Sequence, residues 1–78
     1  MMHKMRIRDL REDHDLKQNA IAKLLGVHQT TYSDYELGNL NIPVEALHTL
    51  ADYYGVSVDY LLGRTDIKTP YPKTQEKE

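Results

Sequence analysis

The sequence predicts an all-α fold, a compact domain of five short helices. Apolar residues recur three and four positions apart in five segments, and no segment alternates apolar and polar residues as a half-buried strand does. A glycine follows four of these segments, where helices commonly end. The chain has 78 residues, and a chain of this length buries about 60% of its unfolded surface, which is enough for one core.

The first helix is predicted over residues 5–14, where Ile7 and Leu10 fall three apart among charged residues. Asp15 follows it, at a place expected for a short turn or an N-cap. A second helix is predicted over residues 18–25, because its apolar residues form a stripe along one side and a glycine comes directly after it.

The remaining three helices are predicted over residues 29–37, 44–54 and 58–62. Pro43 is expected in the first turn of the fourth helix, where its missing N–H costs nothing. Ser57 is expected to cap the fifth helix through its hydroxyl.

The second and third helices have the spacing of a helix-turn-helix motif. Ala22 is the small residue that lets the two helices cross closely, and Gly26, four positions later, accepts the positive φ that the turn needs. Apolar side chains are expected to hold the crossing at Ile21, Leu25, Val27, Tyr32 and Tyr35.

Several blocks of residues extend this motif in both directions. They are Arg6 to Arg11, Gln18, the run IAKLLGV at 21–27, TYSDYELG at 31–38, IPVEAL at 42–47 and LADYYGVSVDYLLG at 50–63. In this order they resemble the phage Cro/repressor-type helix-turn-helix domain of the XRE family, over about three-quarters of the chain. The resemblance implies a repressor-like domain whose third helix enters the DNA major groove, usually as a homodimer on a pseudo-palindromic operator.

Candidate DNA-binding residues lie on the outer side of the third helix. With Ala22, Val27, Tyr32 and Tyr35 facing inward, periodicity exposes His28, Gln29, Thr30, Ser33 and Asp34. The resemblance implies that Gln29 pairs with adenine, that Asp34 accepts from cytosine, and that Thr30 or Thr31 packs a methyl group against thymine. His28 either meets a phosphate or is simply solvated.

The resemblance also implies contacts to the DNA backbone. Gln18 matches a position where a side chain and a helix N-terminus together bind a phosphate. Further backbone contacts are expected from Lys17, Lys23, Asn39 and Asn41.

The charge balance argues against strong nucleic-acid binding. The chain carries 10 Lys and Arg against 12 Asp and Glu, and residues 17–63 carry two lysines against five acidic residues. Leu37 and Leu40 stand where relatives commonly carry polar or basic residues. We expect about two to four phosphate neutralisations per subunit and a shallow salt dependence. The alternative function is a protein-interaction module, an antitoxin or partner-binding domain on the same scaffold with weak DNA affinity.

Several side chains have a structural interpretation beside a functional one. Tyr32 and Tyr35 are expected to pack in the core with hydroxyls that reach solvent, although stacking on bases is the alternative. Glu36 is expected to make a hydrogen bond within its helix or to the next loop. Two alternatives stand for Leu37, Leu40, Tyr60 and Leu62. They either form an exposed apolar patch that binds a second copy or another partner, or they are exposed singly without a function. Core positions are predicted at Ile21, Leu25, Val27, Leu47, Leu50 and Leu61.

The predicted organisation is an N-terminal extension (1–4), the DNA-binding domain (5–63) and a polar, flexible tail (64–78), in which 67–78 are either poorly ordered or a docking segment. No cysteine is present, and the four histidines lack the spacing of metal ligands, so no metal site or small-molecule cofactor is expected. No apolar run is long enough to cross a membrane. The sequence has no nucleophile–base arrangement and no phosphate-binding loop, so an enzyme is not expected. The helix-turn-helix blocks and the resemblance that they carry imply a cytoplasmic DNA-binding transcriptional regulator, a repressor.

Overall fold

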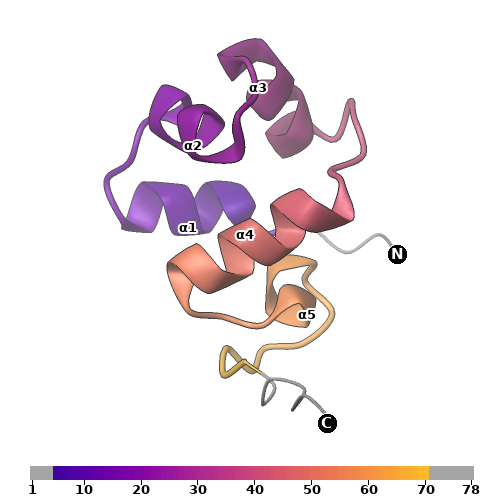
Figure 1. The fold of residues 1–78 in the computed structure, drawn as a ribbon. Helices are drawn as coiled ribbons and strands as arrows, with labels where there is room; N and C mark the ends of the chain where they lie inside the picture. The colour runs from indigo at the N-terminus through magenta and orange to yellow at the C-terminus, as the bar shows by residue number, and fades with distance from the viewer. Residues whose placement is uncertain (1–4, 71–78) are drawn as a thin grey trace, which may run out of the picture.

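The computed structural model describes residues 5–70, and within this range the chain forms helices and no strand (Figure 1). The all-α prediction is confirmed. The helices are α1 (Ile7–Asp13), α2 (Gln18–Leu25), α3 (Gln29–Leu37), α4 (Val44–Tyr54) and α5 (Val58–Leu61). The predicted extension at residues 1–4 and the end of the predicted tail, 71–78, lie outside the described residues.

The predicted helix boundaries are right for α2, α3 and α4 and differ slightly for the other two helices. α1 begins at Ile7, two residues later than predicted, because the backbone N–H of Arg6 donates to the carbonyl of Leu61 (2.8 Å) and ties the chain to α5. Pro43 is the residue before α4 rather than part of its first turn. The predicted cap at Ser57 is confirmed, since its hydroxyl accepts from the N–H of Tyr60 (2.9 Å).

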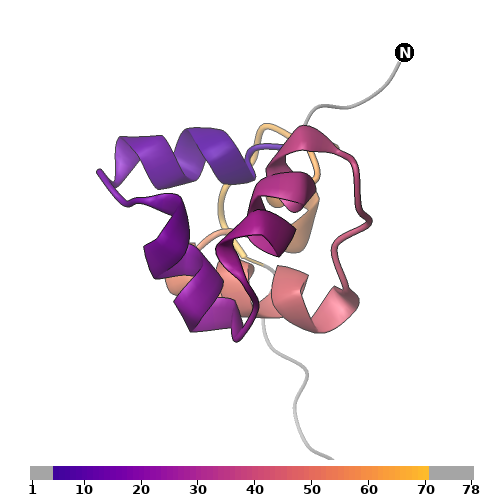
Figure 2. The same cartoon turned by 90° about the horizontal axis from the view of Figure 1, so that it is seen from above.

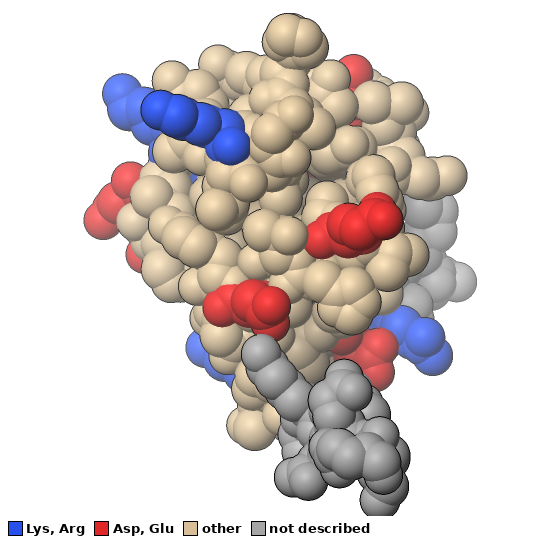
Figure 3. Space-filling view, in the orientation of Figure 1, with Lys and Arg blue, Asp and Glu red and all other residues tan. Residues whose placement is uncertain are grey.

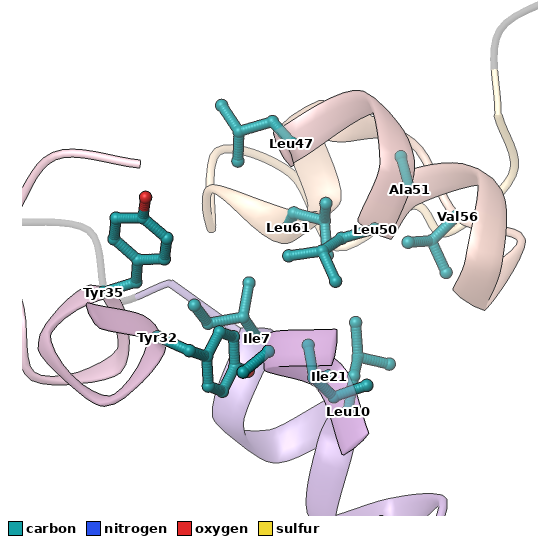
Figure 4. Close-up of a cluster of buried hydrophobic side chains, with 11 residues drawn as sticks. Ile7, Leu10, Ile21, Tyr32, Tyr35, Leu47, Leu50, Ala51, Val56 and Leu61 are labelled. Atoms are coloured by element: carbon teal, nitrogen blue, oxygen red, sulfur yellow. The ribbon is translucent and has the colours of Figure 1, made fainter. Parts of the chain in front are cut away.

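The five helices pack around one small core, to which each contributes a fully buried side chain (Figure 4). α2 and α3 lie on one side of α1, and α4 and α5 lie on the other (Figures 1 and 2). The most deeply buried side chains are Ile7, Ile21, Tyr32, Leu50 and Leu61, one from each helix in chain order. Burying side chains of this size stabilises the fold by about 1.5–3 kcal/mol each.

The core positions expected from periodicity divide into two groups. Ile21, Leu47, Leu50 and Leu61 are buried, as predicted. Leu25 and Val27, next to the turn, are only partly buried and pack against the edge of the core.

The turn between α2 and α3 depends on Gly26. It lies in the left-handed region at φ 72°, and its N–H and that of Val27 donate to carbonyls of the last turn of α2. Because a side chain is strained at this φ, glycine is favoured here. Ala22 is 2% exposed, and α2 packs directly against α3, so the predicted helix-turn-helix pair is confirmed.

A C-terminal strap, residues 64–68, lies against the domain. The carbonyls of Ile67 and Lys68 accept from the hydroxyl and the N–H of Ser57 (3.4 and 2.9 Å). The guanidinium of Arg6 donates to the carbonyl of Thr65 and to the carboxylate of Asp66 (both 2.6 Å). These described residues of the predicted tail are therefore hydrogen-bonded to both ends of the helical domain.

Candidate nucleic-acid interface

α3 is held by a buried inner face that consists of Tyr32 and Tyr35, with Glu36 beside them. The rings of the two tyrosines meet edge to face, with centroids 6.4 Å apart. Tyr32 is fully buried, so its hydroxyl does not reach solvent and that prediction is wrong. The reason is that the ring points into the centre of the core, between α1 and α2 (Figure 4).

The outer face of α3 carries the residues predicted to meet DNA. His28, Gln29 and Thr30, at its N-terminal end, are exposed. The side chains of Thr31, Ser33 and Asp34 are half-exposed. Neither α2 nor α3 begins with a side-chain cap hydrogen bond. In α2 the N–H of Ala20 donates to the carbonyl of Lys17 (3.1 Å), so an anion would bind the N–H groups that precede it.

Asp34 and Asn39 are brought into contact by the end of α3. The amide of Asn39 donates to the carboxylate of Asp34 (3.3 Å), and its backbone N–H donates to the carbonyl of Asp34 (2.9 Å). Asp34 thus already accepts one hydrogen bond through Oδ1, and a cytosine amino group would share the carboxylate with Asn39. Sequence spacing alone did not reveal this pairing, which depends on the left-handed Gly38 between them.

Glu36 makes a long-range ion pair. The prediction that it bonds within its own helix or to the next loop is therefore wrong. Its carboxylate accepts from Nε (2.6 Å) and Nη2 (3.2 Å) of Arg11, and only 3% of its side chain is exposed. Arg11 also donates to the carbonyl of Leu16 (2.8 Å). The pair links α1 to α3 across 25 positions of sequence, which no local pattern reveals.

Gln18, the predicted phosphate ligand at the start of α2, joins this ion pair. Its side-chain amide donates to the carboxylate of Glu36 (3.0 Å). The side chain is half-buried, and the same contact leaves one of its two amide hydrogens for another acceptor. Lys17, Lys23 and Asn41, the other predicted backbone contacts, are exposed.

The pKa values at this junction reflect the competition between burial and charge pairing. Burial disfavours ionisation of Glu36, but hydrogen bonds from Arg11 and Gln18 and the charge of Arg11 outweigh it and hold the pKa of Glu36 below its ordinary value. The hydrogen bonds to Glu36 raise the pKa of Arg11 against the effect of its own burial. Burial raises the pKa of Tyr32, and the carboxylate of Glu36 raises it further.

The surface over α2 and α3 is mostly uncharged. Figure 3 shows Lys and Arg gathered at one edge of this end of the molecule, with mainly uncharged residues over the rest of it. The reason is in the sequence, where no Lys or Arg occurs between Lys23 and Arg64. A ligand of α3 would therefore meet hydrogen-bonding groups and few cations.

No group of three or more His, Asp or Glu side chains in residues 5–70 is placed to hold a metal ion. No helix in the same range has the length and hydropathy needed to span a membrane.

Comparisons with known proteins agree with this geometry. A family model described as helix-turn-helix matches residues 7–61. The uncharacterized HTH-type transcriptional regulator YobD of Bacillus subtilis is 40% identical over 76 residues, which cover 97% of this chain and 66% of YobD. The transcriptional repressor RstR of a cryptic CTXphi phage in Vibrio cholerae is 37% identical over 65 residues, which cover 83% of this chain and 59% of RstR.

A solved structure extends the likeness to three dimensions. The crystal structure of a transcriptional regulator from Listeria innocua matches all of this chain and 68% of its own, with a TM-score of 0.76 and 29% identity. The chain spans less than two thirds of the length of the curated relatives it matches. On the family match and the packing of α2 against α3, this chain belongs to the helix-turn-helix family of the phage Cro/repressor type.

Proposed function

We propose that this protein is a sequence-specific DNA-binding transcriptional regulator, a repressor that acts in the cytoplasm by occupying an operator. The supporting observation is the exposed polar end of α3, which is held rigidly by the buried Tyr32, Tyr35 and Glu36 on its other side. A side chain meets a base edge with useful specificity only when its helix is held in one orientation. The names of YobD and RstR, a regulator and a repressor, support the same function.

In this proposal α3 enters the major groove and its N-terminal residues meet the bases. Gln29 binds adenine through two hydrogen bonds, and the methyl groups of Thr30 and Thr31 pack against thymine. Ser33 and Asp34 meet further base edges, where Asn39 has to release the carboxylate of Asp34 or share it.

The backbone contacts come from both ends of α2 and of α3. Gln18 donates its remaining amide hydrogen to a phosphate while Glu36 holds the other. His28 and Asn39 lie at the two ends of α3 and bind further phosphates. Lys17 and Lys23 add the positive charge. With so few cations, the salt dependence corresponds to about two to four phosphates per subunit.

A selection from a library of random double-stranded DNA at about 50 mM salt, where backbone contacts are strong, tests this function. We expect an enriched pseudo-palindromic motif with half-sites about one helical turn apart, as for a dimer with two-fold symmetry. No enrichment would support the alternative, a partner-binding module, which the lack of Lys and Arg between residues 24 and 63 favours.

A further inference from the structure

The C-terminal strap, residues 64–68, adds no side chain to the core. Within the described chain, every buried side chain belongs to residues 7–61. Ile67 is the apolar residue of the strap, and 67% of it is exposed. Burial of apolar surface therefore contributes little to holding the strap against the domain, and its attachment depends on polar contacts.

Ser57 holds the far end of the strap. Its N–H donates to the carbonyl of Lys68 (2.9 Å), and its hydroxyl donates to the carbonyl of Ile67 (3.4 Å). The near end of the strap is continuous with α5, where the N–H of Arg64 donates to the carbonyl of Asp59 (2.9 Å). Release of the strap would therefore begin beyond Arg64, and it would leave the N–H of Ser57 without its acceptor.

Arg6 holds the middle of the strap from the residue just before α1. Its guanidinium donates to the carbonyl of Thr65 and to the carboxylate of Asp66 (both 2.6 Å). The side chain of Asp66 is 97% exposed, so water and salt weaken that ion pair. The same guanidinium donates to the carbonyl of Tyr60 (3.0 Å) and lies over its ring, 4.2 Å from the centre. The contacts with Tyr60 do not involve the strap, so they keep the guanidinium in place when the strap is released.

We propose that the strap is a latch that opens and closes while the helices stay folded, and that Arg6 is its catch. Opening breaks a few hydrogen bonds, whereas unfolding of the helices exposes the whole core, so opening costs much less free energy. The closed latch fixes the direction in which the chain leaves the domain, at the end of the molecule opposite α2 and α3 (Figure 1). None of its contacts involves a predicted DNA-binding residue, so the latch is independent of the proposed function.

Amide hydrogen exchange of the full chain, followed by NMR, tests the latch. The N–H of Ser57 reports opening, because its acceptor belongs to the strap. The N–H of Leu50, a fully buried residue in the middle of α4, reports unfolding of the domain. After correction for intrinsic exchange rates, we expect the N–H of Ser57 to exchange at least about tenfold faster than that of Leu50 in the parent protein.

Arg6→Lys should weaken the catch, because an ammonium group lacks the planar fork that binds several acceptors together. We expect the exchange rate of Ser57, divided by that of Leu50, to rise at least about tenfold. Arg8→Lys is the matched control, since Arg8 pairs with Glu12 on the exposed side of α1 (3.1 Å), and its ratio should equal that of the parent. Asp66→Asn, which changes only the exposed carboxylate, should raise the ratio by about two- to fivefold.

Two outcomes overturn the proposal. Equal corrected rates for Ser57 and Leu50 in the parent protein would show that the strap opens only when the domain unfolds. An Arg6→Lys variant with the same ratio as Arg8→Lys would show that Arg6 is not the catch. If Arg6→Lys does not fold, Asp66→Asn decides, and an unchanged ratio in that variant also rejects the role of Arg6. Hydrogen exchange needs no DNA, so its result is independent of the library selection.

Discussion

The inner and outer faces of α3 are both rich in polar groups, yet their surroundings are opposite. Tyr32, Tyr35 and Glu36 face the core, where the carboxylate has Arg11 and Gln18 as partners. Gln29 and Thr30 face solvent and have no protein side chain bonded to them among the described hydrogen bonds. The inner face therefore determines how α3 is oriented, and the outer face is left for another molecule. Substitutions on the two faces should separate folding from binding.

Tyr32→Ala should give the largest effect, because it removes a fully buried aromatic ring from the centre of the core. We expect a loss of about 4 kcal/mol in the free energy of unfolding, which is most of the stability of a domain this small. Urea unfolding followed by circular dichroism measures it. A loss under about 1 kcal/mol would show that the ring is not packed as described.

Glu36→Gln should destabilise the domain next most, by about 3 kcal/mol, because it leaves the largely buried guanidinium of Arg11 with only the more distant carboxylate of Glu12 (4.0 Å) as counter-charge. The same unfolding measurement applies. Glu45→Gln is the control, since Glu45 is exposed on α4 and its variant should unfold as the parent does. Equal stabilities for the two variants would mean that the ion pair contributes nothing.

The same pair should give the inner face an acid dependence. The folded pKa of Glu36 lies below the ordinary value of 4.5, so the carboxylate form stabilises the fold. This contribution is complete above pH 4.5 and is lost as the pH falls through the lower folded value. The stability difference between the parent and Glu36→Gln should therefore shrink in acid, as unfolding curves from pH 7 down to about pH 2.5 would show. A constant difference would contradict it.

On the outer face, Gln29→Ala should change binding and not folding. We expect a loss of about 1–3 kcal/mol on the selected operator and a relaxed preference at one base pair, because in the proposed docking Gln29 recognises a single base. Its unfolding free energy should stay within about 0.5 kcal/mol of the parent. Titration of labelled operator variants checks this, and unchanged selectivity at every position would show that α3 docks differently.

Tyr54→Phe should have the smallest effect on stability at neutral pH. It tests whether the hydroxyl of Tyr54 is buried without a hydrogen-bond partner. The hydroxyl of Tyr54 is buried with no hydrogen-bond partner in the described structure, so its removal should change stability by less than about 1 kcal/mol. In alkali the variant should resist unfolding better. Burial raises the pKa of Tyr54 to about 12, so its contribution is complete below pH 10 and is lost as the pH rises through about 12. Identical alkaline unfolding of parent and variant would contradict this.

The described fold was largely predictable because its signals are local. Gly26 and Ala22 lie four positions apart, and their spacing specified both the turn and the crossing of α2 and α3. The outward position of Gln29 and the half-exposed position of Ser33 followed from the same spacing. Whether these residues bind DNA stays a prediction.

The partners of the polar side chains were not predictable in the same way. The family resemblance implies that Gln18 binds a phosphate, but it does not indicate that the amide of Gln18 also donates to Glu36. In the sequence, Arg6 is only one of the residues that carry the family resemblance. In the structure its guanidinium donates to the carbonyls of Thr65 and Tyr60 and so ties the strap, residues 64–68, to α5. These bonds join residues 18 to 59 positions apart, and a side chain's charge does not indicate which distant group it will meet.

The sequence by itself determined the bounds of α2, α3 and α4, which residues form the apolar stripes, and that α2 and α3 form a helix-turn-helix pair. Helical periodicity and the conformation of glycine depend on a few neighbouring residues, so both can be predicted from the sequence alone. Only the tertiary structure decided that Glu36 is a buried counter-ion and that Leu37 borders a groove lined by α3, α4, the loop between them and residues next to α1 and α5. Burial depends on what packs against a face, and for α3 the packing partners come from distant parts of the chain.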